Sequence, residues 1–144
     1  MDIFTPAKRS WLMSRIRGVN TMPEKVVRSF LHMHGLRFRL HLRNLPGKPD
    51  IVLRRHATVV FVHGCFWHHH PGCANATYPR TRSKFWRTKI DGNVKRDKRT
   101  ERRLRDLGWR VITVWECEVS RTRLLTIRLA PLLRSRKRKI ALNG

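Results

Sequence analysis

Two cysteines and four histidines lie within the short segment 63–73, which reads His-Gly-Cys-Phe-Trp-His-His-His-Pro-Gly-Cys. Imidazole and thiolate groups are the side chains that hold zinc in proteins. Cys65, His70 and Cys73 have the spacing of a compact three-ligand set, and Cys117, which follows a later apolar segment, can supply the fourth ligand. Because three cysteines cannot all pair internally, a metal is favoured over a disulfide. The pattern predicts a closed Cys3His site, which is typical of structural zinc.

An alternative treats Cys117 as a buried apolar side chain and assigns the zinc to neighbouring histidines. Three consecutive histidines cannot all bind one ion with good geometry, so His68 and His69 remain for other work. Phe66 and Trp67 lie between polar residues, and this makes them hard to bury in an ordinary core. We therefore expect a metal-stiffened loop that presents aromatic side chains to a partner.

Asp50 is a second candidate, because it directly follows the turn sequence Leu45-Pro46-Gly47-Lys48-Pro49 and begins an apolar segment. It is one of only 9 acidic residues, against 33 Lys and Arg residues and a formal net charge of +24. In so basic a chain a carboxylate is either an ion-pair partner or a ligand for a hard cation such as Mg2+. The charge itself indicates a polyanionic partner, and the excess of Arg over Lys favours bidentate contacts with phosphate.

The elements that position these residues alternate between helical and apolar extended patterns. Helices are expected over residues 7–18, 23–34, 81–107 (with a break at 91–93) and 119–134, and strands over 36–42, 51–53, 57–62 and 109–115. The unbroken apolar character of 57–62 predicts a strand covered on both faces. This arrangement predicts one α/β domain over residues 1–133, followed by a basic tail over 134–144 whose charge run is typical of a solvated arm that contacts phosphate. Neither a secretion signal nor a membrane span is expected, and the free cysteines favour a cytoplasmic, nucleoid-associated protein.

Five segments together resemble the very-short-patch-repair (Vsr) mismatch endonucleases. The matching segments are Pro46–Asp50, Phe61–His70, Thr81–Trp86, Asn93–Asp97 and Gly108–Cys117, and the resemblance covers about residues 8–120. It implies a restriction-endonuclease-like sandwich with a mixed central sheet flanked by helices and a structural zinc site. It also implies a Mg2+-dependent nick in double-stranded DNA beside the T of a T:G mismatch, which starts very short patch repair.

The resemblance carries roles over to particular residues. Asp50 would be the Mg2+ carboxylate, the backbone carbonyl of Val62 a second Mg2+ ligand, and His68 the acid–base residue oriented by Asp97, with His63 and Glu24 nearby. The zinc ligands implied by this route are again Cys65, His70, Cys73 and Cys117. Residues that wedge into the base stack would be Phe66, Trp67 and Trp86 from one groove and Met13 and Ile16 from the other. We expect a monomer on DNA, with other mismatch-repair proteins as further partners.

Several alternatives stay open at this level. Asp97 lies in the run Lys95–Arg99 and suits a solvated helical ion pair, while Glu24 suits the positive end of a helix dipole. One of Phe85 and Trp86 belongs to a core. The chain lacks the Glu-x-Lys that follows the aspartate in most nucleases of this fold, and Val62 stands where the family usually has Thr. The rival functions are a zinc-stiffened nucleic-acid-binding module and a sequence-specific restriction endonuclease.

Overall fold

The structure of the protein is a computed structural model. It describes residues 20–134 of the 144-residue chain. The helix expected over 7–18, with Met13 and Ile16, lies outside the described residues, as does the expected tail apart from its first residue. Within residues 20–134, nine elements follow in order: α2 (Met22–Met33), β1 (Arg39–Leu40), β2 (Ile51–Leu53), η1 (Arg54–His56), β3 (Thr58–His63), α3 (Ser83–Asp106), β4 (Arg110–Trp115), α4 (Glu116–Val119) and α5 (Thr122–Arg134). No helix within the described part of the chain is long and apolar enough to cross a membrane.

The four strands form one mixed sheet in the order β1-β2-β3-β4. β1 pairs with β2 and β2 with β3 in antiparallel fashion, whereas β3 and β4 run parallel, with α3 as the crossover between them. His63 is the register partner of Trp115, so β3 and β4 end at the same edge of the sheet. The loop that follows β3 and the helix that follows β4 therefore leave the sheet side by side. This confirms the predicted mixed sheet flanked by helices.

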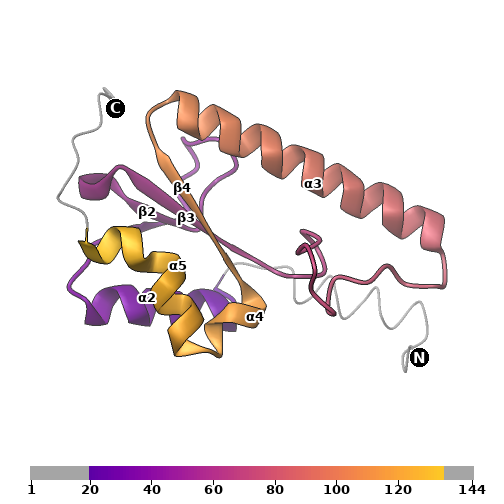
Figure 1. Cartoon of the computed structure of the whole chain (residues 1–144). Coiled ribbons are helices and arrows are strands. Elements are labelled where there is room, and N and C mark those ends of the chain that lie inside the picture. Colours follow the sequence, from indigo (N-terminus) through magenta and orange to yellow (C-terminus); the bar gives the residue numbers. More distant parts are fainter. Residues whose placement is uncertain (1–19, 135–144) are drawn as a thin grey trace.

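Helices cover both faces of the sheet (Figure 1). Val60 of β3 packs with side chains of α2 and α5, while its neighbours Val59 and Phe61 pack on the other face with Leu104 of α3. Side chains of a strand alternate between the two faces, so a stretch covered on both sides, such as Val59–Phe61, is apolar at successive positions. The prediction that the apolar run 57–62 forms a strand covered on both faces is thus confirmed.

Several boundaries shift by one or two residues from the sequence expectations, and three differences are larger. α3 has no break at 91–93, because Ile90 is buried against Phe66 and Trp86 and the Asn93 amide donates to the carbonyl of Trp67 at 3.1 Å. These contacts offset the roughly 1 kcal/mol that a helical glycine such as Gly92 costs. The helix expected over 119–134 is two helices, α4 and α5, and the strand expected over 36–42 is only the two residues of β1.

The turn before Asp50 packs against the middle of α3. Gly47 has a φ of +71°, and a Cβ at this position would overlap the methyl group of Thr100. A side chain there is excluded both by the left-handed backbone and by the close approach of the helix. This contact ties the start of β2, and with it Asp50, to the helix that carries Asp97.

Candidate active site and metal cluster

A cavity of about 520 Å³ opens where β2 begins and β3 ends. Four of the nine acidic residues of the chain line it, and these come from four separate parts of the sequence: Glu24, Asp50, Asp97 and Glu116. His63 and His68 line the same cavity. In a chain of net charge +24, this concentration of carboxylates creates a local environment that attracts cations.

Asp50 lies at the start of β2 and reaches across to β3. Its Oδ2 accepts a 2.7 Å hydrogen bond from the backbone N–H of Val62. Burial is the main cause that raises the pKa of Asp50 to about 6, and the neighbouring Glu24 raises it further, while the Val62 N–H opposes the shift. The N–H and C=O groups of one strand residue point to the same side. The Val62 carbonyl therefore shares the side of the strand on which Asp50 lies.

Glu24 is nearly fully buried, with 3% of its surface exposed, although it lies in the first turn of α2. Its Oε2 accepts from the guanidinium of Arg28 at 2.8 Å and from the backbone N–H of Asn20 at 3.0 Å, and it lies 3.2 Å from Nε2 of His41. A carboxylate oxygen of Glu24 also lies within 4.8 Å of a carboxylate oxygen of Asp50. The structure thus places Glu24 beside Asp50 in the cavity, in addition to its place at the helix start.

A histidine–carboxylate pair lines the same cavity. Nδ1 of His68 lies 2.6 Å from Oδ2 of Asp97, which comes from the middle of α3. Among residues 20–134 no Lys or Arg forms an ion pair with Asp97, so the interpretation as a solvated helical ion pair is wrong. A carboxylate is an acceptor only, so this contact places the proton of a neutral His68 on Nδ1 and leaves Nε2 as an acceptor.

The imidazole ring of His63 packs against one face of the imidazole ring of His68. The two imidazoles stack with their centroids 3.8 Å apart and their planes within 4°. Burial, reinforced by the neighbouring His68, lowers the pKa of His63 to about 3, so that His63 is neutral near pH 7. The stack fixes the orientation of His68 without adding a positive charge next to it.

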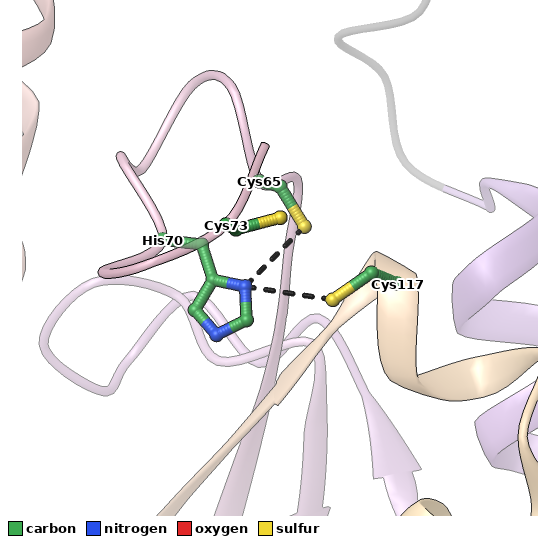
Figure 2. Close-up of side chains that lie close together, drawn as sticks. All are labelled: Cys65, His70, Cys73 and Cys117. Carbon is green, nitrogen blue, oxygen red and sulfur yellow. Dashed lines mark hydrogen bonds between the residues drawn. The ribbon is translucent and has the colours of Figure 1, made fainter. Parts of the chain in front are cut away.

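The cysteines and His70 form a second cluster, at the edge where β3 and β4 end (Figure 2). Cys65, His70 and Cys73 come from the loop after β3 and Cys117 from α4, and their ligand atoms all lie within 4.8 Å of one another. Nδ1 of His70 is 3.7 Å from Sγ of Cys65 and 3.5 Å from Sγ of Cys117. The four ligands predicted from the sequence are therefore brought together, and all three cysteines are free thiols.

This donor set fits zinc. Tetrahedral zinc with Zn–S bonds of about 2.3 Å and Zn–N bonds of about 2.0–2.1 Å separates its ligand atoms by about 3.5–3.8 Å. Burial raises the pKa of the Cys65 thiol to about 12, so deprotonation at neutral pH requires a bound cation. His68 pairs with Asp97 and the ring of His69 stacks on Tyr78, which leaves His70 as the histidine that faces the thiols. The geometry favours the Cys3His set over the alternative with neighbouring histidines.

The aromatic residues are more buried than the sequence indicated. Phe66 and Trp86 are 9% and 5% exposed and pack with Ile90, while Trp67 is half-buried against both at centroid distances of 5.4 and 6.0 Å. The expectation that Phe66 resists burial is wrong, because α3 supplies an apolar surface that its local sequence does not reveal. Of the pair Phe85 and Trp86, Trp86 is the buried member, and Phe85 is 44% exposed. Phe66 and Trp67 both line the cavity.

Two residues, one in the cavity and one beside it, were not predicted from the sequence. Glu116 lines the cavity and its Oε1 accepts a 3.0 Å hydrogen bond from the backbone N–H of Cys65, so it joins the cavity to the metal cluster. His41 contacts Glu24. For Glu116 a signal existed, since an acidic residue directly before a candidate ligand is unusual in so basic a chain. For His41 the sequence offers none.

The fold and the site together define an α/β protein whose side chains suit cation-assisted hydrolysis. The family model of the DNA mismatch endonuclease Vsr matches residues 1–75. The chain is 49% identical over 132 residues to the type II nicking enzyme V.XorIIP of Xanthomonas oryzae, covering 92% of this chain and 96% of the relative. It is also 46% identical over 125 residues to the DNA mismatch endonuclease Vsr of Escherichia coli, and this match covers 87% of this chain and 80% of the relative. The chain therefore belongs to the Vsr family of DNA endonucleases, as its motifs indicated.

Proposed function

We propose that this endonuclease nicks double-stranded DNA beside the T of a T:G mismatch, in a Mg2+-dependent hydrolysis that starts very short patch repair. The observation that carries the proposal is the presence, in one cavity, of the partly buried Asp50 carboxylate and the His68–Asp97 couple. Hydrolysis of a phosphodiester needs a base for the attacking water and positive charge for the phosphate. The two sides of the cavity hold side chains suited to these two tasks.

His68 is the proposed acid–base residue. Its Nδ1–H donates to Asp97, so its Nε2 is available to take the proton of the attacking water. Asp97 fixes the tautomer of His68 and stabilises the imidazolium that forms. The neutral His63 stacks on the ring of His68 and holds its orientation.

Asp50 and the backbone carbonyl of Val62 are the proposed Mg2+ ligands, and Glu24 supports them from the start of α2. When bound there, Mg2+ would supply positive charge against the phosphate and lower the pKa of a bound water. The Val62 N–H holds the Asp50 carboxylate in place. Since the proposed contact from Val62 is a backbone group, its Val side chain is compatible with the role that Thr has in the family.

Zinc is proposed to be structural and separate from the chemistry. A Cys3His set is closed, with no ligand position left for substrate. Bound at Cys65, His70, Cys73 and Cys117, it would join the loop after β3 to α4 after β4. That loop carries His68 and the aromatic residues, so the metal would hold both at the edge of the cavity.

Mismatch selection is proposed to reside in Phe66, Trp67 and Trp86, together with Met13 and Ile16 of the N-terminal segment. A mismatched step costs less to unstack than a paired one, so aromatic wedges favour it. Arg and Lys contacts with phosphate would add affinity without sequence preference. We also propose that residues 1–133 form one domain that acts as a monomer in the cytoplasm on chromosomal DNA, with other mismatch-repair proteins as partners.

The decisive experiment incubates the protein with labelled duplexes that carry T:G or are fully paired, in Mg2+ or in EDTA. We expect a single nick in the mismatched duplex, dependent on Mg2+. Cleavage of both strands of paired DNA would instead support a restriction endonuclease. Binding without cleavage in either duplex would support a nucleic-acid-binding module.

A further inference from the structure

We propose that His41 is a positioning residue, which holds the Glu24 carboxylate beside Asp50 and so preorganises the cation-binding side of the cavity. The inference rests on the proposed Mg2+-dependent function. His41 follows β1, outside the motifs that relate the chain to its family, and it does not line the cavity. Any effect on the site must therefore pass through the residues that it contacts.

The main chain of His41 is tied to Asp50. Its backbone N–H donates to the backbone carbonyl of Asp50 at 3.2 Å. Its φ of 48° lies in the left-handed region, which side-chain-bearing residues rarely adopt. Such a conformation costs free energy and persists only where the surrounding structure compensates for it, and these positions cluster at functional sites. Here the conformation directs the imidazole of His41 towards Glu24.

The ring of His41 completes the surroundings of a buried carboxylate. Nε2 of His41 lies 3.2 Å from Oε2 of Glu24, whose side chain is 5% exposed, and Arg28 lies 2.8 Å from the same oxygen. A buried carboxylate is unfavourable unless donors compensate for its lost hydration. Glu24 additionally has the carboxyl group of Asp50 as a neighbour of like charge. The two donors hold Glu24 in place against this repulsion.

Direct coordination is the competing interpretation, because the ligand atoms of Glu24, His41 and Asp50 lie within 4.8 Å of one another. Three contacts argue against it. Oε2 of Glu24 already accepts from a guanidinium and a backbone N–H, and Nε2 of His41 lies 3.5 Å from the guanidinium of Arg28. A cation bound to that imidazole would lie next to a fixed positive charge. His41 therefore acts through Glu24 rather than as a ligand.

Two amide substitutions separate the contact from the backbone conformation. In His41→Gln the longer side chain can place an N–H near the position of Nε2, whereas in His41→Asn the amide is too short to reach Glu24. Asn tolerates the left-handed backbone better than Gln does. If the backbone conformation alone mattered, Gln would be the more harmful substitution; if the contact matters, Asn is the more harmful one. His32→Asn, at an exposed residue of α2, is the matched control.

Two measurements serve as the readout. The first is isothermal titration calorimetry of the full chain with MgCl2 in the absence of DNA, and the second is the dependence of the nicking rate on Mg2+ concentration. We expect His41→Asn to weaken Mg2+ binding by about tenfold, as is typical when a residue behind a ligand is lost. The nicking rate at saturating Mg2+ should change by less than about threefold, because no group that touches substrate is removed. His41→Gln and His32→Asn should bind Mg2+ within about twofold of the unmodified chain.

Two results would overturn the inference. They are unchanged Mg2+ binding in His41→Asn, and a greater loss of Mg2+ binding in His41→Gln than in His41→Asn. The proposed function is judged separately. If the unmodified chain binds Mg2+ but nicks no T:G duplex, that function fails, while the titrations still decide the role of His41.

Discussion

The backbone N–H of Cys65 donates a 3.0 Å hydrogen bond to Oε1 of Glu116. These residues are 51 positions apart in the sequence. Glu116 directly precedes the candidate ligand Cys117, and Cys65 is itself a candidate ligand. The bond joins the loop after β3 to α4, at the boundary between the metal cluster and the cavity. The arrangement gives one carboxylate two neighbours, the Cys3His cluster on one side and the candidate active-site cavity on the other.

Replacement of Glu116 should therefore affect both neighbours. Glu116→Ala leaves the Cys65 N–H without its acceptor, and we expect a loss of about 1–3 kcal/mol in the free energy of unfolding together with slower nicking. Glu116→Gln keeps an acceptor oxygen and should retain most of both. Urea unfolding of the two variants measures the difference. Equal stability of Glu116→Ala and the unmodified chain would show that the hydrogen bond between Cys65 and Glu116 does not stabilise the fold.

Cys117→Ala tests the proposed zinc site. Metal binding contributes folding free energy where the ligands come from separate segments, so this variant should lose both zinc and a large part of its stability. Metal analysis and the melting temperature, both measured under reducing conditions, provide the check. One retained equivalent of zinc with an unchanged melt would contradict the assignment.

Asp50→Ala should abolish nicking while DNA binding stays equal or becomes tighter. The substitution removes the proposed Mg2+ carboxylate and also removes a negative charge that faces the phosphate. Single-turnover nicking and binding to a T:G duplex in Ca2+ separate the two effects. Nicking at the unmodified rate would mean that the cation binds elsewhere.

The pKa of Asp50 predicts a pH dependence of Mg2+ binding. Burial raises this pKa from 3.8 to about 6, so below pH 6 the metal-free carboxyl is mostly protonated and Mg2+ must displace the proton. The sign for stability is the reverse of that for a salt-bridged aspartate. The folded state is favoured below pH 3.8, and this contribution is lost as the pH rises through about 6.

Added Mg2+ should therefore raise the melting temperature more at pH 7 than at pH 5. Asp50→Asn, which cannot ionise, should remove the difference between the two pH values. The melts can be recorded with and without Mg2+ in matched buffers of constant ionic strength. A Mg2+ effect that is larger at pH 5 would exclude Asp50 as the ligand that titrates.

Trp67→Ala tests the wedge. Trp67 is the least buried of the three proposed wedge aromatics, and base–aromatic stacking contributes about 1–3 kcal/mol per base. We expect the ratio of T:G to paired binding to fall by roughly tenfold or more, with a nearly unchanged salt dependence. Replacing several arginines should instead reduce the salt dependence and leave the ratio intact.

Phe85→Ala is the matched control, because Phe85 is exposed and adjacent to Trp86 but lies outside the proposed wedge. Competition binding at two salt concentrations distinguishes the variants. Equal weakening of mismatched and paired binding in Trp67→Ala would make Trp67 a structural residue of the metal loop.

Features set by short spacing were accessible from the sequence. Cys65, His70 and Cys73 lie within nine positions, so their types and spacing alone predicted a common cluster, and the apolar residues 57–62 predicted a central strand. Asp50 was accessible because its turn and strand are adjacent in the chain. Each of these follows from local geometry, in which neighbours in sequence are necessarily neighbours in space.

Tertiary structure decided the relationships between distant segments. The parallel register of β3 and β4 brings Cys117 to the loop ligands and Glu116 to Cys65, and the packing of α3 brings Asp97 to His68. The same helix stays continuous through Gly92 and buries Phe66, contrary to the local pattern. The contact of His41 with Glu24 depends on a left-handed residue 17 positions away. Local periodicity reports which face of an element is apolar, but the free energy of packing between elements determines which polar groups meet.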